Sequence, residues 1–231
     1  MKIHIAHKFR EDPWGGGNSF LKNLRKEFIM RGIYSNNLFD AHCLLIDSYP
    51  FSNEHILIKL IQYKRTNPDG IIIHRINGPI YLYRGTSKSI DRLIGKISAL
   101  FSDGIIYQST YSRQANDEFF EIRSPFSGVV INAADPSIFY RKLNSQKHTR
   151  IKLIATSWSS NARKGFDIYS YLDSHLDFTK YDMTFVGNSP ISFKNIKRLS
   201  PQQHKELAEI IRSHDIYITA SLYDSCSNAL I

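Results

Sequence analysis

The sequence predicts an α/β protein built on doubly wound parallel sheets, and three observations lead to this fold class. Short apolar runs typical of buried strands alternate with segments of helical periodicity, and the connections between them are short. The run Gly70–Ile76 (GIIIHRI) is apolar on both faces, as a central parallel strand covered by helices would be. The alternation is interrupted by the polar, basic segment 138–150 and resumes at Ile151, so we expect two domains, residues 1–144 and 150–231.

Composition limits the class of protein. The 231 residues suffice for one large or two small domains, and the 42% of hydrophobic residues is normal for a protein with a buried core. The net charge of +9 is spread out, with 19 basic against 13 acidic residues in 1–144 and 11 against 8 in the remainder. Such a charge suits nucleic acid, an anionic membrane surface or anionic small molecules. Nucleic acid is the least favoured, because no helix-turn-helix, zinc-finger or RNP-like motif is present in the sequence.

Nothing in the sequence predicts secretion or a disulfide framework. Cys43 and Cys226 are far apart and lack metal-ligand spacing, which favours a reducing compartment. The N-terminal residues have no apolar region of the kind found in signal peptides. No stretch approaches the roughly 18–20 apolar residues of a membrane span. We therefore expect a cytoplasmic protein, with membrane association at most peripheral.

The first domain should contain five strands joined by helices. The expected strands are Lys2–Ala6, His42–Asp47, Gly70–Ile76, Gly104–Tyr107 and Gly128–Ile131. The expected helices run from Phe20 to Met30, from Ile56 to Tyr63, from Ser89 to Leu100 and from Tyr111 to Phe120.

A glycine-rich loop should follow the first strand. Pro13 and the glycines Gly15, Gly16 and Gly17 break regular structure, and Asn18 or Ser19 can cap the helix that follows. Glycines at a strand–helix junction let a ligand approach the backbone closely. Neither the dinucleotide fingerprint nor the P-loop pattern is met, and a simple flexible loop is the alternative interpretation.

His74 and Arg75 lie at the end of the most apolar strand. Ligands of open parallel sheets bind outside the carboxyl ends of the strands, so a histidine and an arginine there are candidates for a site. A structural role for His74 is the alternative.

The second domain repeats the alternation. Its expected elements are a strand at Ile151–Ala155, a helix from Phe166, a strand at Asp182–Val186, an extended segment at Asn195–Arg198, a helix at Pro201–Arg212 and a strand at Asp215–Ala220. Residues Ser221–Ile231 look like the start of another helix, with an apolar face and no cap. We therefore expect the second domain to be incomplete.

An anion site is expected where the first strand of this domain meets its helix. A polar loop follows the strand, and Arg163, Lys164 and Gly165 then precede the helix. A helix N-terminus presents unpaired N–H groups, and a lysine there adds a full positive charge toward a phosphate. An ordinary strand–helix turn with a solvated Arg-Lys pair is the alternative.

Five motifs taken together resemble the family-4-type glycosyltransferases of the GT-B fold, over nearly the whole chain. They are Gly15-Gly16-Gly17-Asn18, Asn132-Ala133-Ala134-Asp135, Lys164-Gly165, Val186-Gly187-Asn188-Ser189-Pro190 and Ser221-Leu222-Tyr223-Asp224. The resemblance implies two Rossmann-like domains with a nucleotide-sugar site in the cleft between them. It also implies retaining transfer of a hexose from a UDP- or GDP-linked donor to a glycan or lipid-linked acceptor, without a metal or other cofactor.

The resemblance also assigns residues. It implies that Lys164 binds the donor phosphates, that Asp224 hydrogen-bonds the donor sugar, and that His74 orients a hydroxyl. The donor-binding residues by the same resemblance are Gly15, Gly16, Gly17, Asn18, Arg163, Gly187, Ser225, Cys226 and Ser227. A basic first domain would face the acceptor, including an anionic lipid surface.

Two departures from the family pattern bear on function. The family carries an arginine shortly before the lysine, where this sequence has Ser157-Trp158-Ser159-Ser160. The family's E-x7-E motif begins here with Asp224, and its second acid would fall one position past Ile231, so we expect this chain alone to be inactive. A non-catalytic nucleotide-sugar-binding relic is the principal alternative, and a basic nucleic-acid binder is a more distant one.

Overall fold

The computed structural model describes residues 1–11, 16–52, 55–119, 126–141, 149–227 and 230. The chain divides into two compact units. Unit 1 comprises Met1–Glu11 and Gly16–Asn132, and unit 2 comprises the described residues of Ala133–Ile231. The expected domain limits at residues 144 and 150 stay a prediction.

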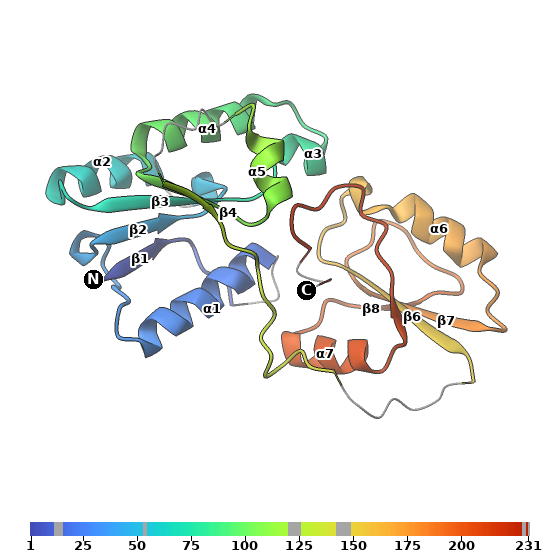
Figure 1. The fold of residues 1–231 in the computed structure, drawn as a ribbon. Coiled ribbons are helices and arrows are strands. Elements are labelled where there is room, and N and C mark those ends of the chain that lie inside the picture. Colours follow the sequence, from blue (N-terminus) through green and yellow to red (C-terminus); the bar gives the residue numbers. More distant parts are fainter. Residues whose placement is uncertain (12–15, 53–54, 120–125, 142–148, 228–229, 231) are drawn as a thin grey trace. The chain divides into compact units, whose positions relative to one another are not determined.

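Unit 1 contains a sheet of five parallel strands (Figure 1). In spatial order they are β1 (Ile3–Ala6), β2 (Cys43–Ile46), β3 (Ile71–Ile76), β4 (Gly104–Tyr107) and β5 (Phe126–Val129). A parallel bridge joins Ile3 to Tyr34, and Ile3 also pairs with Cys43 of β2. The segment at Tyr34 thus lies on one side of β1 and β2 lies on the other. The direction in which successive segments add to the sheet therefore reverses at β1.

Helices cover both faces of this sheet (Figure 1). Helix α1 (Gly16–Met30) packs Leu21 against Ile5 and Leu45 on one face. Helices α2 (Ile56–Thr66) and α4 (Ser89–Phe101) share a core with Leu44 and Ile72 on the other face. The remaining helical elements are η1 (Leu38–Asp40), η2 (Pro50–Ser52), α3 (Ile80–Arg84) and α5 (Thr110–Asn116). The isoleucine-rich β3 lies at the centre, as its two apolar faces predict.

Unit 2 contains a second parallel sheet, of four strands. In spatial order they are β8 (Lys197–Leu199), β7 (Tyr181–Gly187), β6 (Ile151–Ser157) and β9 (Ile216–Tyr217). The helical elements are η3 (Ala162–Lys164), α6 (Phe166–His175) and α7 (His204–Arg212). Successive strands add on one side of β6 and the last adds on the other, so the strand order reverses between β6 and β9. The predicted α/β class with parallel sheets is confirmed in both units.

Asp173 ties α6 to the segment that enters β8. Its carboxylate accepts the backbone N–H groups of Lys194, Asn195 and Ile196 at 2.7–2.8 Å. Burial alone would raise the pKa of Asp173, but these hydrogen bonds outweigh it and lower the pKa from its usual value of 3.8.

Several predicted boundaries were wrong. Helix α1 begins at Gly16, so Gly16 and Gly17 are helical, and Asn18 and Ser19 lie inside the helix rather than at its cap; Gly15 lies outside the described residues. The described part of the final segment, 221–227 and 230, contains no helix where one was expected. Strand β5 begins two residues before the expected Gly128. Helix α3 was missed, because five residues are too few to reveal a helical period.

Candidate functional site

The carboxyl end of β6 leads into a turn that positions two cations. Asn161 caps η3, since its Oδ1 accepts the backbone N–H of Arg163 at 2.9 Å. Gly165 follows with φ of 78°, and a Cβ there would lie 2.2 Å from the carbonyl oxygen of Ala220. Glycine is therefore required for the turn that carries Lys164 to approach the chain leaving β9.

Lys164 and Asp224 meet at this point. The Lys164 Nζ lies 3.2 Å from Asp224 Oδ2, and the two side chains are 28% and 31% exposed. The backbone N–H of Leu222 donates to the Arg163 carbonyl at 3.0 Å, which fixes the two segments together. The Arg163 guanidinium lies 5.4 Å from the ring centre of Tyr223. Two segments some 60 residues apart thus place a cation pair and a carboxylate where the strand order reverses, the position at which open α/β sheets bind ligands.

Gly187 is the last residue of β7 and lies at the same carboxyl edge of the sheet. It has φ of 130°, and a Cβ there would lie 1.9 Å from the Ser157 carbonyl oxygen. The next residue, Asn188, donates its backbone N–H to that carbonyl and its side-chain Nδ2 to the carbonyl of Trp158, at 2.9 and 2.7 Å. These contacts give Gly187 a packing role, and direct binding of a donor by Gly187 stays a prediction.

Ser225, Cys226 and Ser227 follow Asp224 and are partly exposed. They are not helical, so they do not present the N–H groups of a helix start toward Lys164. Their assignment to the donor also stays a prediction.

In unit 1, Asn18 makes hydrogen bonds within the fold, and its assignment to the donor stays a prediction. It is 5% exposed, accepts the Arg10 backbone N–H at 3.1 Å and donates to the Arg10 carbonyl at 3.0 Å. Its Oδ1 also lies 3.3 Å from His7 Nε2. Asn18 therefore holds the segment that leaves β1 against helix α1. A Cβ added at the neighbouring Gly17 would meet no atom within 4 Å, so the backbone there has open space beside it.

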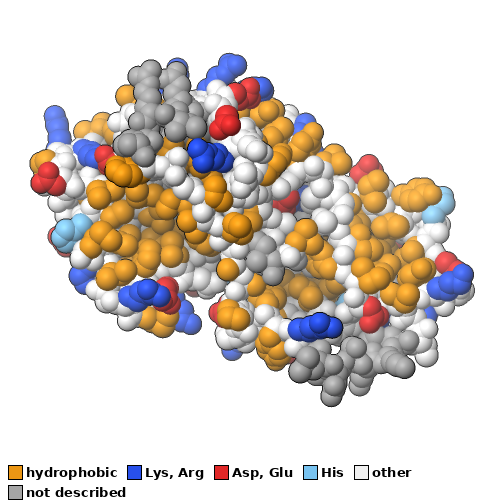
Figure 2. Space-filling view, in the orientation of Figure 1, with side chains coloured by type: hydrophobic (Ala, Val, Ile, Leu, Met, Phe, Trp, Pro, Cys, Tyr) orange, Lys and Arg blue, Asp and Glu red, His pale blue; other side chains and the backbone are white. Residues whose placement is uncertain are grey.

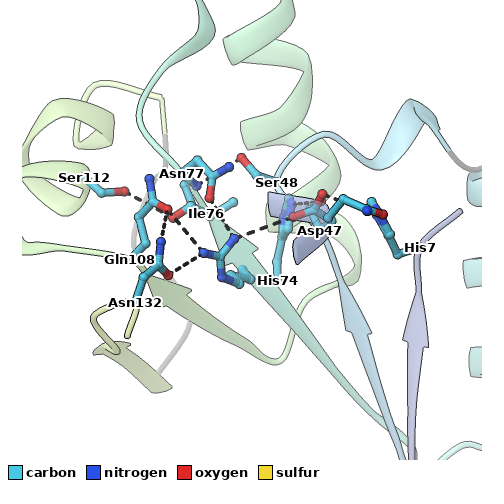
Figure 3. A network of polar contacts seen from close by, with 11 residues as sticks. His7, Asp47, Ser48, His74, Ile76, Asn77, Gln108, Ser112 and Asn132 are labelled. Carbon is cyan, nitrogen blue, oxygen red and sulfur yellow. Dashed lines mark hydrogen bonds and ion pairs between the residues drawn. The ribbon is translucent and has the colours of Figure 1, made fainter. Parts of the chain in front are cut away.

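His74 is fully buried at the end of β3 (Figure 3). Its Nε2 hydrogen-bonds the Asp47 carbonyl at 3.2 Å. Burial lowers the pKa of His74 to about 4, against the opposing effect of backbone hydrogen bonds at Asp47 and Ser48. The ring is therefore neutral near pH 7 and holds the chain that leaves β2. These contacts favour the structural alternative, and the orienting role toward a hydroxyl stays a prediction.

Arg75 is the centre of a polar network that joins the ends of four strands. Figure 3 labels its partners Asp47, Asn77, Gln108 and Asn132. It is 3% exposed and lies 3.7 Å from the Asp47 carboxylate. It donates to the side-chain oxygens of Asn77, Gln108 and Asn132 at 2.9, 3.2 and 2.8 Å. Its guanidinium also lies 4.1 Å from the ring centre of Phe20 in α1.

Sequence analysis singled out Arg75, and Asn132 only as part of a family motif, but it did not predict that the two belong to one network with Asp47 and Gln108. Asp47, Gln108 and Asn132 each stand just beyond the apolar run of a parallel strand, and so does His7, whose Nδ1 lies 3.6 Å from Asp47 Oδ2. The first polar residue after each strand is a signal that could have found them, because parallel strands end at one edge.

Within the described ranges, no group of three or more His, Cys, Asp or Glu side chains is gathered around a common metal position. No helix in those ranges is both long and apolar enough to cross a bilayer. Cys43 and Cys226 are both free thiols.

No protein-family model and no curated protein matches this sequence. Several solved structures are similar to it. In the comparison with sucrose-phosphate synthase from Thermosynechococcus elongatus, the aligned region covers 99% of this chain and 78% of the synthase, with a TM-score of 0.72 and 10% sequence identity. HepE from Anabaena, in complex with UDP and glucose, matches all of this chain over 77% of its own, with a TM-score of 0.69 and 12% identity. The catalytic domain of starch synthase IV from Arabidopsis thaliana, bound to ADP and acarbose, matches 93% over 59%, with a TM-score of 0.57 and 10% identity. The chain therefore shares the α/β fold of these GT-B glycosyltransferases.

Proposed function

We propose that this chain belongs to a retaining, metal-independent glycosyltransferase of the family-4 type, which moves a hexose from a UDP- or GDP-linked donor to a glycan or lipid-linked acceptor in the cytoplasm. The observation that carries the proposal is the Lys164–Asp224 pair at the reversal of strand order in unit 2. The ligands named for the similar structures, UDP with glucose and ADP with acarbose, support a nucleotide-sugar donor.

The first chemical task of such a site is to stabilise a departing diphosphate. When the bond between the anomeric carbon and the phosphate oxygen breaks, negative charge grows on that oxygen. A preorganised cation stabilises this charge most strongly where water is excluded. Lys164 is the principal cation of the proposal, because η3 and Gly165 fix its backbone and 28% of its side chain is accessible. Arg163 adds a second positive charge on the same turn.

The second task is to hold the sugar. We assign Asp224 to a hydroxyl of the donor sugar, because its carboxylate lies beside the phosphate-binding lysine and accepts hydrogen bonds. The acceptor oxygen forms the new bond to the anomeric carbon, and its proton passes to the departing diphosphate. No carboxylate of the chain is given a covalent role.

Calorimetric titration of the chain with UDP, GDP and ADP tests the donor site. Lys164→Gln should weaken nucleoside diphosphate binding about 10- to 100-fold, the range expected for losing one hydrogen bond to a charged group. Lys180→Gln is the matched control, because the Lys180 Nζ is also 3.2 Å from an aspartate, Asp177, but at the amino end of β7. Equal affinities for wild type and Lys164→Gln, or no binding of any of the three nucleotides, would refute the proposed donor site.

A non-catalytic nucleotide-sugar binder is the second candidate. The segment leaving β6, Ser157-Trp158-Ser159-Ser160, carries no cation, and this observation favours it. A chain that binds the nucleotide through Lys164 but neither transfers nor hydrolyses the sugar would decide for this candidate.

A further inference from the structure

Helices α2 and α4 carry an unusual outward surface on unit 1. Both pack onto the same face of the sheet, since Leu60 and Ile97 belong to one buried cluster, and Figure 1 shows the two helices over that face. Their outward side chains include five aliphatic residues that are 41–77% exposed: Leu57, Ile58, Ile61, Leu93 and Leu100. Exposed Arg65, Arg92 and Lys96 stand among them. We call these eight residues the α2–α4 outer face.

The charge on the two helices has one sign at the surface. They contain five Lys or Arg and a single acid, Asp91. Asp91 is 3% exposed, and its carboxylate accepts hydrogen bonds from the backbone N–H groups of Ile80 and Tyr81 at 2.6 and 3.1 Å. The outer face itself thus contains no carboxylate.

Two acidic residues from neighbouring segments of the described chain pair with lysines on or next to these helices. Asp103 accepts from Lys64, and Glu118 accepts from Lys88, the residue that precedes α4, both at 2.6 Å. Neither therefore neutralises Arg65, Arg92 or Lys96 across the outer face.

We propose that the α2–α4 outer face docks unit 1 onto an anionic membrane surface. Amphipathic helices bind bilayers when aliphatic side chains enter the headgroup boundary and flanking cations meet anionic lipids. Figure 2 shows exposed hydrophobic side chains on unit 1, with both basic and acidic ones around them. A second copy of the chain fits this face less well, because an isologous contact would set these cations against each other with no carboxylate between them.

This inference extends the acceptor side of the proposed function, but it does not require the chain to transfer a sugar. A membrane-docked unit 1 would meet an acceptor anchored in the bilayer. Donor binding involves Lys164 and vesicle binding involves the outer face, so the two proposals can fail separately.

Co-sedimentation of the full chain with vesicles tests the proposal. We expect binding to phosphatidylcholine vesicles that contain phosphatidylserine and little binding to phosphatidylcholine alone. Arg92→Gln/Lys96→Gln should lower the partition coefficient about 25-fold, because each cation near an anionic surface contributes roughly fivefold. Leu93→Gln/Leu100→Gln should lower it by a similar factor.

Matched controls keep the result interpretable. Lys197→Gln/Arg198→Gln removes the same charge from exposed positions of β8, and Ile168→Gln/Tyr171→Gln removes exposed hydrophobic surface from α6. Both should bind vesicles like wild type, and circular dichroism should show all four variants folded. Absence of wild-type binding to phosphatidylserine vesicles, or equal losses in variants and controls, would overturn the proposal. So would a dimer of the wild-type chain that Leu93→Gln/Leu100→Gln converts to a monomer, since this would assign the face to a second copy.

Discussion

Replacing Arg75 by methionine tests whether the buried network holds the carboxyl edge of unit 1 together. Methionine keeps much of the length and apolar contact of the side chain but removes its charge and all its donors. The Asp47 carboxylate, whose side chain is 13% exposed, would then lose its buried cation, and the oxygens of Asn77, Gln108 and Asn132 would lose a donor. Removing one partner of a buried pair costs about 3–5 kcal/mol. The lost contact with Phe20 is included in that range.

The assay is denaturant unfolding, with hydrogen exchange of peptides from β2 to β4 to assign the transition to unit 1, because two units can unfold separately. Arg75→Met should lose about 3–5 kcal/mol of unfolding free energy, a large share of the ~5–15 kcal/mol typical of a domain. Arg113→Met, on the exposed side of α5, is the control and should change stability by less than about 0.5 kcal/mol. A loss of under ~1 kcal/mol for Arg75→Met would refute the reasoning, because it would mean that these contacts are replaced at no cost.

Three further changes test the structure at single positions. Gly187→Ala should destabilise unit 2 by at least ~2 kcal/mol in thermal unfolding, because its Cβ would collide with the Ser157 carbonyl at φ of 130°; a neutral result would contradict that geometry. Gly17→Ala should instead stabilise α1 by about 0.5–1 kcal/mol, since it lies within the helix and its Cβ would meet no atom, and a loss of stability would be the contrary result. Asp173→Asn should cost about 1.5–3 kcal/mol near neutral pH. Folding lowers the pKa of Asp173, so the ionised carboxylate stabilises the fold above its usual pKa of 3.8, and this stabilisation is lost as pH falls through the lower folded pKa. Denaturant midpoints of Asp173→Asn should therefore fall less at acid pH than those of the wild type.

Strands β2 and β3 were predictable from local sequence because each is a short, largely apolar run followed by a polar residue. β2 and β3 lie within the predicted ranges and differ by one or two residues at their ends. β9 is shorter than its apolar run, Asp215–Ala220, because only Ile216 and Tyr217 pair with β6. Hydrogen-bonded pairing, which no single segment contains, decides where a strand ends.

The start of α1 was not predictable from propensity. Two successive glycines disfavour a helix by roughly 1 kcal/mol each, so the sequence favours a loop at Gly16 and Gly17. The structure continues the helix through them, and tertiary contacts explain why: Asn18 is pinned to Arg10 by two hydrogen bonds, and Leu21 is fully buried against the sheet. Packing of the apolar face thus outweighs the local cost.

The candidate site was likewise predictable only in part from local sequence. The residues alone predict a cation turn at Lys164, but only the family resemblance connected it with Asp224. The 3.2 Å contact depends on β9 adding to the opposite side of β6, which no local pattern reveals. The Arg75 network depends likewise on β2, β4 and β5 ending at one edge with β3.

In both sheets, polar side chains gather where the strand order reverses, but the exposure of these side chains differs between the two units. In unit 1 the winding reverses at β1, and the side chains of His7 and Asp47 nearest this reversal are only 10% and 13% exposed and lie 3.6 Å apart. In unit 2 the reversal falls between β6 and β9, and Lys164 and Asp224 there remain about one third accessible. A buried charge depends on its partners within the fold, whereas an accessible one can exchange its partner for a ligand. This difference in exposure, rather than residue type, is why we assign the donor phosphates to Lys164 and a structural task to Arg75.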